Sequence, residues 1–436
     1  MLFDEAVNYL LSLGHETLAM KLGLANVARL LDALDNPQRA YPAVQIAGTN
    51  GKGSTAAMLD AICRAARLRT GLYTSPHLVS LTERIKLDGH DIAPAEFARH
   101  ATEVRVAAEE LHAMSGARPT FFEQTTAIAL LAFASTHVEL AILETGLGGR
   151  LDATTAAHAQ TIAITPIALD HQQYLGDTLA QIAAEKAAII RPDTQVVLAQ
   201  QPDEAREVIL ARCRACEVTP AWATEEVRVL DATTDGRLVV TFRTAADVYE
   251  RVRLALRGRH QLTNAAVGLA LAETLRVKGF AIPRAAIIEG LQTTVHPGRL
   301  ELLSGTPPML LDGAHNAAGA AALRAYLDEF AHAPVTLLFG AMADKQLDEM
   351  CAALFPVARH IILTRPTNAR AATPYQLRQL AARHTGEHAI EFIASPVVAL
   401  ARARALTPSG GLVCVSGSLY LVGEVRGLLL RAQTGE

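Results

Sequence analysis

The sequence predicts an α/β protein of two domains, and three observations lead to this fold class. Apolar runs of strand length alternate with helical patterns along most of the chain, as in a parallel sheet covered by helices on both faces. The chain has 436 residues, which is too long for one ordinary hydrophobic core. A stretch with proline and glycine at residues 293–299 interrupts the alternation and is suited to a linker. We therefore expect an N-terminal domain over residues 1–295 and a C-terminal domain over residues 296–436.

The N-terminal domain is predicted to combine a P-loop ATPase-like parallel sheet with a small antiparallel sheet. Its buried strands are expected at Val44–Ala47, Thr70–Tyr73, Val138–Leu143, Thr161–Ile164 and Gln195–Ala199. Its helices are expected at Ser54–Ala66, Phe121–Ser135, Leu179–Ile190, Asp203–Glu217, Asn264–Lys278 and Pro283–Leu291. Shorter, partly alternating segments separated by turn residues predict antiparallel strands at Glu226–Leu230, Arg237–Phe242 and Arg251–Leu256.

The C-terminal domain repeats the βαβ pattern and is predicted to be Rossmann-like. Its strands are expected at Met309–Leu311, Val335–Phe339, His360–Thr364, Ala389–Ile393 and Leu412–Val415. Its helices are expected at Ala317–Phe330, Gln346–Leu354, Tyr375–His384 and Pro396–Leu406. Ligands of open α/β sheets gather at the carboxyl ends of the strands, so polar residues that follow strands are the candidates for a site.

Composition narrows the class of protein. Half of the residues are hydrophobic and 19% are charged, as in a globular enzyme. The formal net charge of −4 gives no general attraction to nucleic acid or acidic membranes, and no apolar run approaches the roughly 20 residues of a membrane span. The first residues lack the layout of a signal peptide. We expect a cytoplasmic protein with reduced thiols, including the lone C-x-x-C at Cys213–Cys216.

The clearest motif is G-T-N-G-K-G-S at residues 48–54, between a predicted strand and a predicted helix. Glycines let backbone N–H groups surround phosphate oxygens, a lysine offsets their charge, and a hydroxyl reaches magnesium. The positive end of the following helix adds to this effect. Unlike the usual G-x-x-x-x-G-K-[ST] pattern, Gly53 here separates Lys52 from Ser54. The motif predicts binding of a nucleoside triphosphate.

Polar residues also follow three other predicted strands, at 74–77, 144–152 and 168–171. A hydroxyl, a carboxylate and an imidazole at successive strand ends can converge near the phosphates and offer ligands for magnesium. Each feature has a structural alternative: a tight turn at Gly146–Gly149, a helix cap at Ser75, or a hydrogen-bonded structural role for His171. Their common position beside a P-loop favours a functional site.

Three further residues have two interpretations each. Lys186 lies in a largely apolar helical stretch, where a lysine usually extends to solvent or pairs with a carboxylate. A buried lysine of lowered pKa also reacts with carbon dioxide. Asp312, where a strand meets a helix, suits a ribose contact or a helix cap, and Arg299 in the linker suits a phosphate contact across a cleft or a solvated position.

Taken together, these pieces resemble the folylpolyglutamate synthase / dihydrofolate synthase family of the Mur ligase group. The resemblance runs in order over nearly the whole chain. The matching motifs are G-T-N-G-K-G-S at 48–54, T-S-P-H-L at 74–78, E-T-G-L-G-G-R-L-D-A-T at 144–154, A-L-D-H at 168–171, E-K-A at 185–187, P-G-R at 297–299, D-G-A-H-N at 312–316 and G-S-L-Y-L-V-G-E at 417–424.

The resemblance implies a role for individual residues. Those implied to bind ATP are Asn50, Gly51, Lys52, Gly53, Ser54, Asn264, Arg299 and Asp312. Those implied as ligands of two magnesium ions are Ser54, Ser75, Glu144, His171 and Lys186, the last after carbamylation. Lys52, Glu144, His171 and Lys186 are the implied catalytic residues. The implied pterin contacts are Leu22, Gly23, Phe122, Glu123, Leu151, Asp152 and Ala153, and the implied glutamate contacts are His315 and Ser416.

The implied activity is ATP-dependent addition of L-glutamate to dihydropteroate and to reduced folates through an acyl phosphate. The resemblance also allows a monovalent cation and implies a monomer without nucleic-acid or membrane partners. The alternatives are polyglutamylation alone, a Mur-type peptidoglycan-precursor ligase, and a P-loop nucleotide switch without ligation. Two departures from the family pattern concern substrate preference: Thr155 where asparagine is frequent, and Thr165-Pro166 where a serine is usual.

Overall fold

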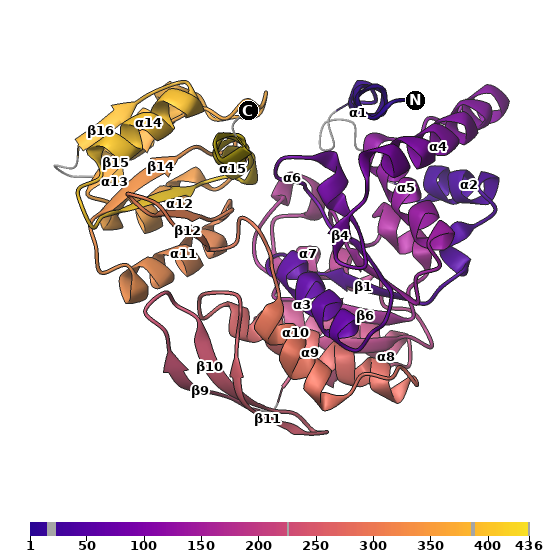
Figure 1. Ribbon diagram of the computed structural model, residues 1–436. Coiled ribbons are helices and arrows are strands. Elements are labelled where there is room, and N and C mark those ends of the chain that lie inside the picture. The colour runs from indigo at the N-terminus through magenta and orange to yellow at the C-terminus, as the bar shows by residue number, and fades with distance from the viewer. Residues whose placement is uncertain (15–22, 225, 385–388, 435–436) are drawn as a thin grey trace.

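The computed structural model describes residues 1–14, 23–224, 226–384 and 389–434, and it has the expected two-part α/β architecture (Figure 1). Within these residues the larger sheet has the strand order β4-β3-β2-β5-β1-β6-β7-β8. Its strands are β1 (Ala43–Ala47), β2 (Thr70–Tyr73), β3 (Ile85–Leu87), β4 (His90–Asp91), β5 (Leu140–Glu144), β6 (Thr161–Ile164), β7 (Gln195–Leu198) and β8 (Ala221–Trp222). The five expected strands form its parallel centre, paired in register from β2 to β7.

Helices cover both faces of this sheet because its central strands are apolar on both sides. Leu140 and Ile142 of β5 belong to the core beneath one helical layer, and Ala141 and Leu143 belong to the opposite core. The first layer contains α3 (Lys52–Ala65), α9 (Gln261–Val277) and α10 (Arg284–Thr293). The second contains α1 (Phe3–Ser12), α2 (Ala25–Ala33), α4 (Pro94–Ser115) and α5 (Phe121–Ser135). Helices α7 (Leu179–Ala187) and α8 (Asp203–Ala215) pack in a further core beside β6 and β7.

The small antiparallel sheet, in the order β11-β10-β9, is confirmed but one of its strands lies elsewhere than expected. Its strands are β9 (Glu226–Ala232), β10 (Leu238–Arg243) and β11 (Val248–Arg253). The expected position for β11, Arg251–Leu256, was wrong because a bulge hides the start of the strand. Arg251 has a φ of 52° and the pairing register shifts beside it, so buried Tyr249 and Val252 are three residues apart instead of two.

The second large sheet has the order β12-β13-β17-β14-β15-β16 and is parallel except for β12, which pairs antiparallel with β13. Its strands are β12 (Glu301–Leu303), β13 (Met309–Leu311), β14 (Val335–Phe339), β15 (His360–Leu363), β16 (Ala389–Phe392) and β17 (Leu412–Ser416). Its helices are α11 (Ala317–Phe330), α12 (Leu347–Leu354), α13 (Pro374–His384), α14 (Pro396–Leu406) and α15 (Leu419–Thr434). The chain passes from one part to the other between α10 and β12.

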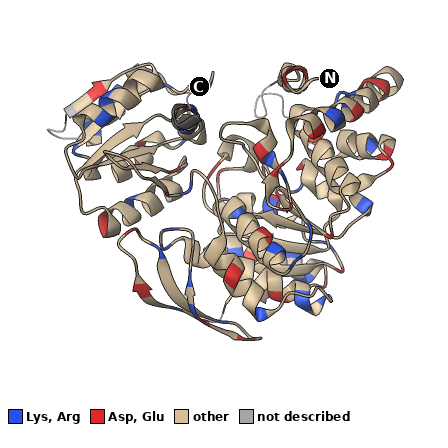
Figure 2. Cartoon of the chain, viewed as in Figure 1, with Lys and Arg blue, Asp and Glu red and all other residues tan. Residues whose placement is uncertain are grey.

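The short edge strands β3, β4, β8 and β12 were not expected, because two or three residues carry too little periodicity to be seen in a sequence. None of the described helices is long and apolar enough to cross a membrane. Positive and negative side chains are interspersed over both parts of the molecule (Figure 2).

Candidate active site

The loop between β1 and α3 has a backbone shape that only glycine accepts at two positions. Gly51 directly precedes α3 with a φ of 88°, and a Cβ atom there would lie 2.0 Å from Oδ1 of Asn264. A Cβ atom on Gly48 would lie 1.9 Å from Oγ1 of Thr165. The carbonyl of Pro166 accepts hydrogen bonds from the N–H groups of Thr49 at 3.0 Å and Asn50 at 3.3 Å. Thr165 and Pro166, which stand where the family usually has a serine, therefore contact the phosphate loop and hold its backbone.

Lys52 lies in the first turn of α3 and folds back over this loop. Its Nζ donates hydrogen bonds to the carbonyls of Gly48 and Thr49, each at 3.2 Å. Burial lowers the pKa of Lys52, and the nearby carboxylate of Glu144 acts in the opposite direction. A phosphate bound at the N-terminus of α3 could replace these two carbonyls and form an ion pair with the ammonium group of Lys52.

The polar strand ends converge as expected. In the sheet order, β2, β5, β1 and β6 are neighbours, and they end respectively near Ser75, Glu144, the phosphate loop and His171. The N–H of Ser75 donates to Oε2 of Glu144 at 3.2 Å. Burial raises the pKa of Glu144 and Lys52 opposes that rise. These residues and the phosphate loop line one pocket. We call this pocket the nucleotide pocket.

Burial lowers the pKa of two nitrogen groups that line the nucleotide pocket. Burial lowers the pKa of His171 to about 3, and it lowers the pKa of Lys186 on α7 to about 7. Lys186 is 4% exposed, so the interpretation that its side chain extends to solvent is wrong. An amine that is neutral near pH 7 is nucleophilic, which is the condition for reaction with carbon dioxide.

The C-terminal part supplies the opposite wall of the nucleotide pocket through Arg299, Asp312, His315 and Asn316. The carboxylate of Asp312 accepts hydrogen bonds from the N–H groups of Leu300 at 2.9 Å and Ala314 at 3.0 Å. It therefore shapes the turn after β13, although it also lines the pocket. The Nη1 of Arg299 donates to the carbonyl of Gly313 at 3.3 Å.

A buried ionic junction that sequence reasoning missed joins the two parts beside His171. Oδ1 of Asp170 accepts from Nζ of Lys345 at 2.6 Å, and Oδ2 accepts from Nδ2 of Asn316 at 3.0 Å. The same Asn316 amide donates to Oδ1 of Asn50 in the phosphate loop at 3.0 Å. Burial acts to raise the pKa of Asp170, but the attraction of protonated His171 and of Lys345 outweighs it and holds that pKa below its usual value. Asp170 and Lys345 both follow strands, so the rule that identified His171 applied to them too.

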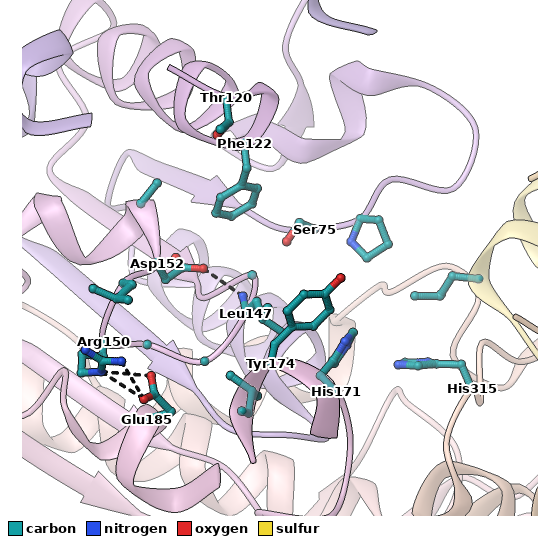
Figure 3. Close-up of a pocket in the computed structure, with 18 of the residues that line it drawn as sticks. Ser75, Thr120, Phe122, Leu147, Arg150, Asp152, His171, Tyr174, Glu185 and His315 are labelled. Carbon is teal, nitrogen blue, oxygen red and sulfur yellow. Dashed lines mark hydrogen bonds and ion pairs between the residues drawn. The ribbon is translucent and has the colours of Figure 1, made fainter. Parts of the chain in front are cut away.

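A second, largely apolar pocket adjoins the nucleotide pocket (Figure 3). Phe122 and Thr120 from the start of α5 lie on one side of it, Leu147 and Asp152 from the glycine-rich loop after β5 on another, and His315 lies across from them. We call this second pocket the acceptor pocket. The residues that line it are Gly23, Ser75, Pro76, Thr120, Phe122, Glu123, Gly146, Leu147, Gly148, Gly149, Arg150, Leu151, Asp152, Ala153, His171, Tyr174, Leu175, Glu185, His315, Met342, Lys345, Arg370, Ser418, Leu419 and Tyr420.

The two pockets share part of their walls. The residues that line both are Ser75, Pro76, Gly146, Leu147, His171, Leu175, His315 and Leu419. A molecule in the acceptor pocket can therefore place one end beside the phosphate loop.

Most of the expected site residues line one of the two pockets. The expected nucleotide and metal residues all line the nucleotide pocket, and Gly23, Phe122, Glu123, Leu151, Asp152 and Ala153 line the acceptor pocket. Leu22 lies outside the described residues. Ser416 is fully buried at the end of β17 and lines neither pocket, whereas Ser418 lines the acceptor pocket. Thr155 also lies behind the acceptor pocket instead of in its wall.

The residues present fit a magnesium ion held together with nucleotide phosphates. Glu144 offers a carboxylate and Ser54 and Ser75 offer hydroxyls in one pocket, and the buried Nδ1 of His171 has no hydrogen-bond partner among the described residues. In the described part of the chain, no three His, Cys, Asp or Glu side chains cluster closely enough to hold a metal by themselves. Magnesium needs only one or two protein ligands when phosphate and water complete its shell.

Comparison with known proteins first defines a class. The Mur ligase middle domain matches residues 46–272, and the Mur ligase glutamate ligase domain matches residues 298–419. The chain thus contains the middle domain and the glutamate ligase domain of a Mur ligase.

Individual relatives narrow this class. The chain is 33% identical to the dihydrofolate synthase/folylpolyglutamate synthase of Bacillus subtilis, over 95% of this chain and 96% of the relative. It is 37% identical to a probable bifunctional folylpolyglutamate synthase/dihydropteroate synthase of Haloferax volcanii over 99% of its own length, but it spans only about half (51%) of that longer protein. The chain belongs to the folylpolyglutamate synthase/dihydrofolate synthase family.

Solved structures agree with this assignment. Folylpolyglutamate synthase of Mycobacterium tuberculosis, complexed with ADP, superposes with a TM-score of 0.91 at 33% identity, covering 98% of both chains. The E. coli FolC structure with DHPP and ADP gives 0.88 at 28% identity, covering 99% of each chain. The Yersinia pestis bifunctional enzyme, with AMPPNP and a Mn ion, gives 0.84 at 27% identity, covering 99% of this chain and 98% of that one. Structures of this family thus include nucleotide and divalent-metal complexes.

Proposed function

We propose that this protein is an ATP-dependent ligase that adds L-glutamate to dihydropteroate and to reduced folates. The observation that carries the proposal is the shared wall of the two pockets, from Ser75 through His171 to His315. It places the far end of a molecule in the acceptor pocket beside the phosphate loop. An enzyme that transfers phosphate to a bound carboxylate needs this arrangement.

The proposed reaction has two steps. A carboxylate oxygen of the acceptor attacks the γ-phosphorus of ATP, the bond from that phosphorus to ADP breaks, and an acyl phosphate forms. The α-amine of glutamate, after losing a proton, attacks the acyl carbon, and inorganic phosphate leaves as the amide forms. Lys52 and Arg299 would offset the charge that develops on the transferred phosphoryl group, and the surrounding walls would exclude water from the acyl phosphate.

A divalent cation bound among Ser54, Ser75, Glu144 and His171 would supply further charge stabilisation for the phosphoryl group. We propose that Lys186 is carbamylated and adds a carboxylate to this set, because its amine is buried and its pKa is lowered to about 7, so that a large fraction is uncharged at neutral pH. Carbon-13 NMR of the protein equilibrated with labelled bicarbonate should show a carbamate signal that is absent from Lys186→Met. A wild-type spectrum without that signal would exclude the modification.

For glutamate, the C-terminal wall of the acceptor pocket favours Lys345, Arg370 and Ser418 over Ser416. A molecule with two carboxylates needs more than one cation, and Lys345 and Arg370 both line this wall. The buried Nε of Arg370 has no hydrogen-bond partner among the described residues, which leaves a donor for an anion. His315, held neutral because burial lowers its pKa to about 4, lines both pockets and remains a proposed contact for glutamate.

We also propose that residues 1–295 and 296–436 move as two bodies about the connection near Gly298. One chain supplies every wall of both pockets, which supports a monomer as the active state. Gly298 has a φ of 69°, and a Cβ atom there would lie 3.0 Å from Leu78 Cδ1, so a larger residue would stiffen and crowd this connection. Gly298→Val should lower turnover, and unchanged kinetics would count against the hinge.

The direct test is phosphate release from ATP with magnesium and glutamate, compared for dihydropteroate, tetrahydrofolate and no acceptor. Release that depends on both acceptors and on glutamate supports the bifunctional ligase. Release with tetrahydrofolate alone restricts the activity to polyglutamylation. ATP hydrolysis that needs neither acceptor nor glutamate would support a nucleotide switch and overturn the proposal.

A further inference from the structure

A glutamine lies in the middle of the large sheet, where a parallel strand is normally apolar. Gln45 of β1 is fully buried, and its neighbours Val44 and Ile46 are ordinary core residues. Burying an amide costs free energy unless its polar atoms find partners. The partners of Gln45 therefore show what this side chain does.

The amide nitrogen of Gln45 contacts three threonine hydroxyls. Nε2 lies 2.8 Å from Oγ1 of Thr155, 3.0 Å from Oγ1 of Thr154 and 3.2 Å from Oγ1 of Thr145. Thr154 and Thr155 belong to a short 3₁₀ helix, η3 (Ala153–Ala157), that directly follows Asp152. The two N–H bonds of the amide match the two shortest of these contacts.

Both of these hydroxyls in turn donate a hydrogen bond to a residue that lines the acceptor pocket. Thr154 donates its proton to Oδ1 of Asp152 at 2.5 Å, and Thr155 donates its proton to the carbonyl of Gly149 at 2.8 Å. A hydroxyl has one proton, so a threonine that donates forward can only accept from the group behind it. Gln45, which donates to both hydroxyls, is therefore the first member of both chains.

The ends of these two chains form part of the acceptor pocket wall. Asp152 and Gly149 both line the pocket, and Oδ2 of Asp152 also accepts from the N–H of Leu147 at 2.9 Å (Figure 3). A Cβ atom on Gly149 would lie 3.0 Å from the carbonyl of Lys186, so this turn is held close to α7. A shift of either end would alter the pocket without touching the nucleotide.

We propose that Gln45 is a positioning residue for the acceptor: through Thr154 it orients the Asp152 carboxylate, and through Thr155 it holds the glycine-rich turn. Oδ1 of Asp152 already accepts from the backbone N–H and the hydroxyl of Thr154, so the fitting ligand is a heterocycle with an N–H donor that Oδ2 accepts. This inference rests on the proposed function and deepens it. It also assigns a role to Thr155, which departs from the family pattern: this residue lies behind the pocket and connects Gln45 to the glycine-rich turn.

The carbonyl of Gln45 argues against a purely structural role. Its Oε1 is buried and has no hydrogen-bond partner among the described residues. An unpaired buried carbonyl destabilises a fold, so an apolar side chain would serve packing better. Gln45 is explained by its donors, and these lead to the pocket.

The test is Gln45→Met, which keeps the approximate shape and removes the donors. We expect the KM for dihydropteroate, or for tetrahydrofolate, to rise about tenfold while the KM for ATP changes less than twofold. The matched control is Gln38→Met, which removes another buried glutamine whose Oε1 has no partner and which lines neither pocket. This control should leave all kinetic constants unchanged.

A double-mutant cycle separates positioning from general destabilisation. If Gln45 acts through Thr154, then Gln45→Met should raise the KM of the acceptor far less in a Thr154→Val background than in the wild type. Equal effects in both backgrounds, or parallel changes in the KM for ATP and the melting temperature, would overturn the inference. Absence of acceptor-dependent turnover in the wild type would instead refute the proposed function, so the two failures are distinguishable.

Discussion

Replacing Lys345 with methionine should open the junction between the two parts of the molecule. Lys345 and Asp170 are 2.6 Å apart, and both side chains are 7% exposed. Removing one partner of a buried ion pair costs about 3–5 kcal/mol, because the remaining charge is left without compensation. Here the backbone N–H of His171 and the side-chain amide of Asn316 still donate to Asp170, so we expect a cost at the lower end of that range.

This cost applies to the closed arrangement, since opening would return Asp170 to water. About 3 kcal/mol corresponds to a shift of roughly 150-fold toward the open form. We therefore expect turnover to fall by up to two orders of magnitude, while the melting temperature changes little because each part has its own core. Phosphate release measures turnover, and small-angle X-ray scattering with an ATP analogue but no glutamate measures closure.

The controls separate closure from substrate binding. Lys278→Met removes a lysine on the surface of the first part and should have no effect. In an Asp170→Asn background, Lys345→Met should cost much less than in the wild type, because no buried carboxylate is left unpaired. Turnover within twofold of wild type, or an equal cost in both backgrounds, would refute the reasoning. A raised KM for glutamate with unchanged scattering would assign Lys345 to substrate alone.

Two other predictions follow from local geometry. Gly51→Ala should weaken ATP binding more than tenfold, because the new Cβ atom would overlap Asn264. Gly279→Ala controls for backbone strain, because Gly279 has a similar φ of 97° and a Cβ atom there would have nothing within 4 Å. Equal ATP affinity in both variants would contradict this prediction. Burial acts to raise the pKa of Asp235, but its bonds to Thr233 and Arg257 outweigh it and lower that pKa. Its stabilisation is therefore present above the unfolded pKa of about 4 and lost as the pH falls through the folded value. Asp235→Asn should be less stable than wild type in urea at pH 7 by about 1–2 kcal/mol, this difference should shrink as the pH falls below about 4, and a constant difference would exclude this contribution.

Much of the candidate site could be predicted because parallel strands end at one edge. Ser75, Glu144 and His171 are far apart in the chain, yet each follows an apolar strand, and the strand order then brings them beside the phosphate loop. The same local signal was present for Asp170 and Lys345, but their pairing across the two parts was not visible. An ion pair depends on the relative placement of two sheets, which no local periodicity encodes.

Other differences have a comparable origin. The glutamate contact expected at Ser416 stays a prediction. This residue follows a strand like the other candidates, but its side chain is fully buried, because the strand-end rule places a residue without deciding which way it faces. The bulge at Arg251 removed the alternation that would have located β11. Such features arise from pairing with neighbouring strands, which a single segment does not reveal.

The sequence by itself determined the class of fold, the phosphate loop and the elements that carry the catalytic candidates, because these depend on periodicity and on residue types at fixed spacing. Only the tertiary structure decided which side chains meet. It made Lys186 a buried amine, joined the two pockets along one wall, and placed Gln45 behind Asp152 through Thr154. Burial, pKa and hydrogen-bond direction are properties of surroundings assembled from distant segments, so they exist only once the chain has folded.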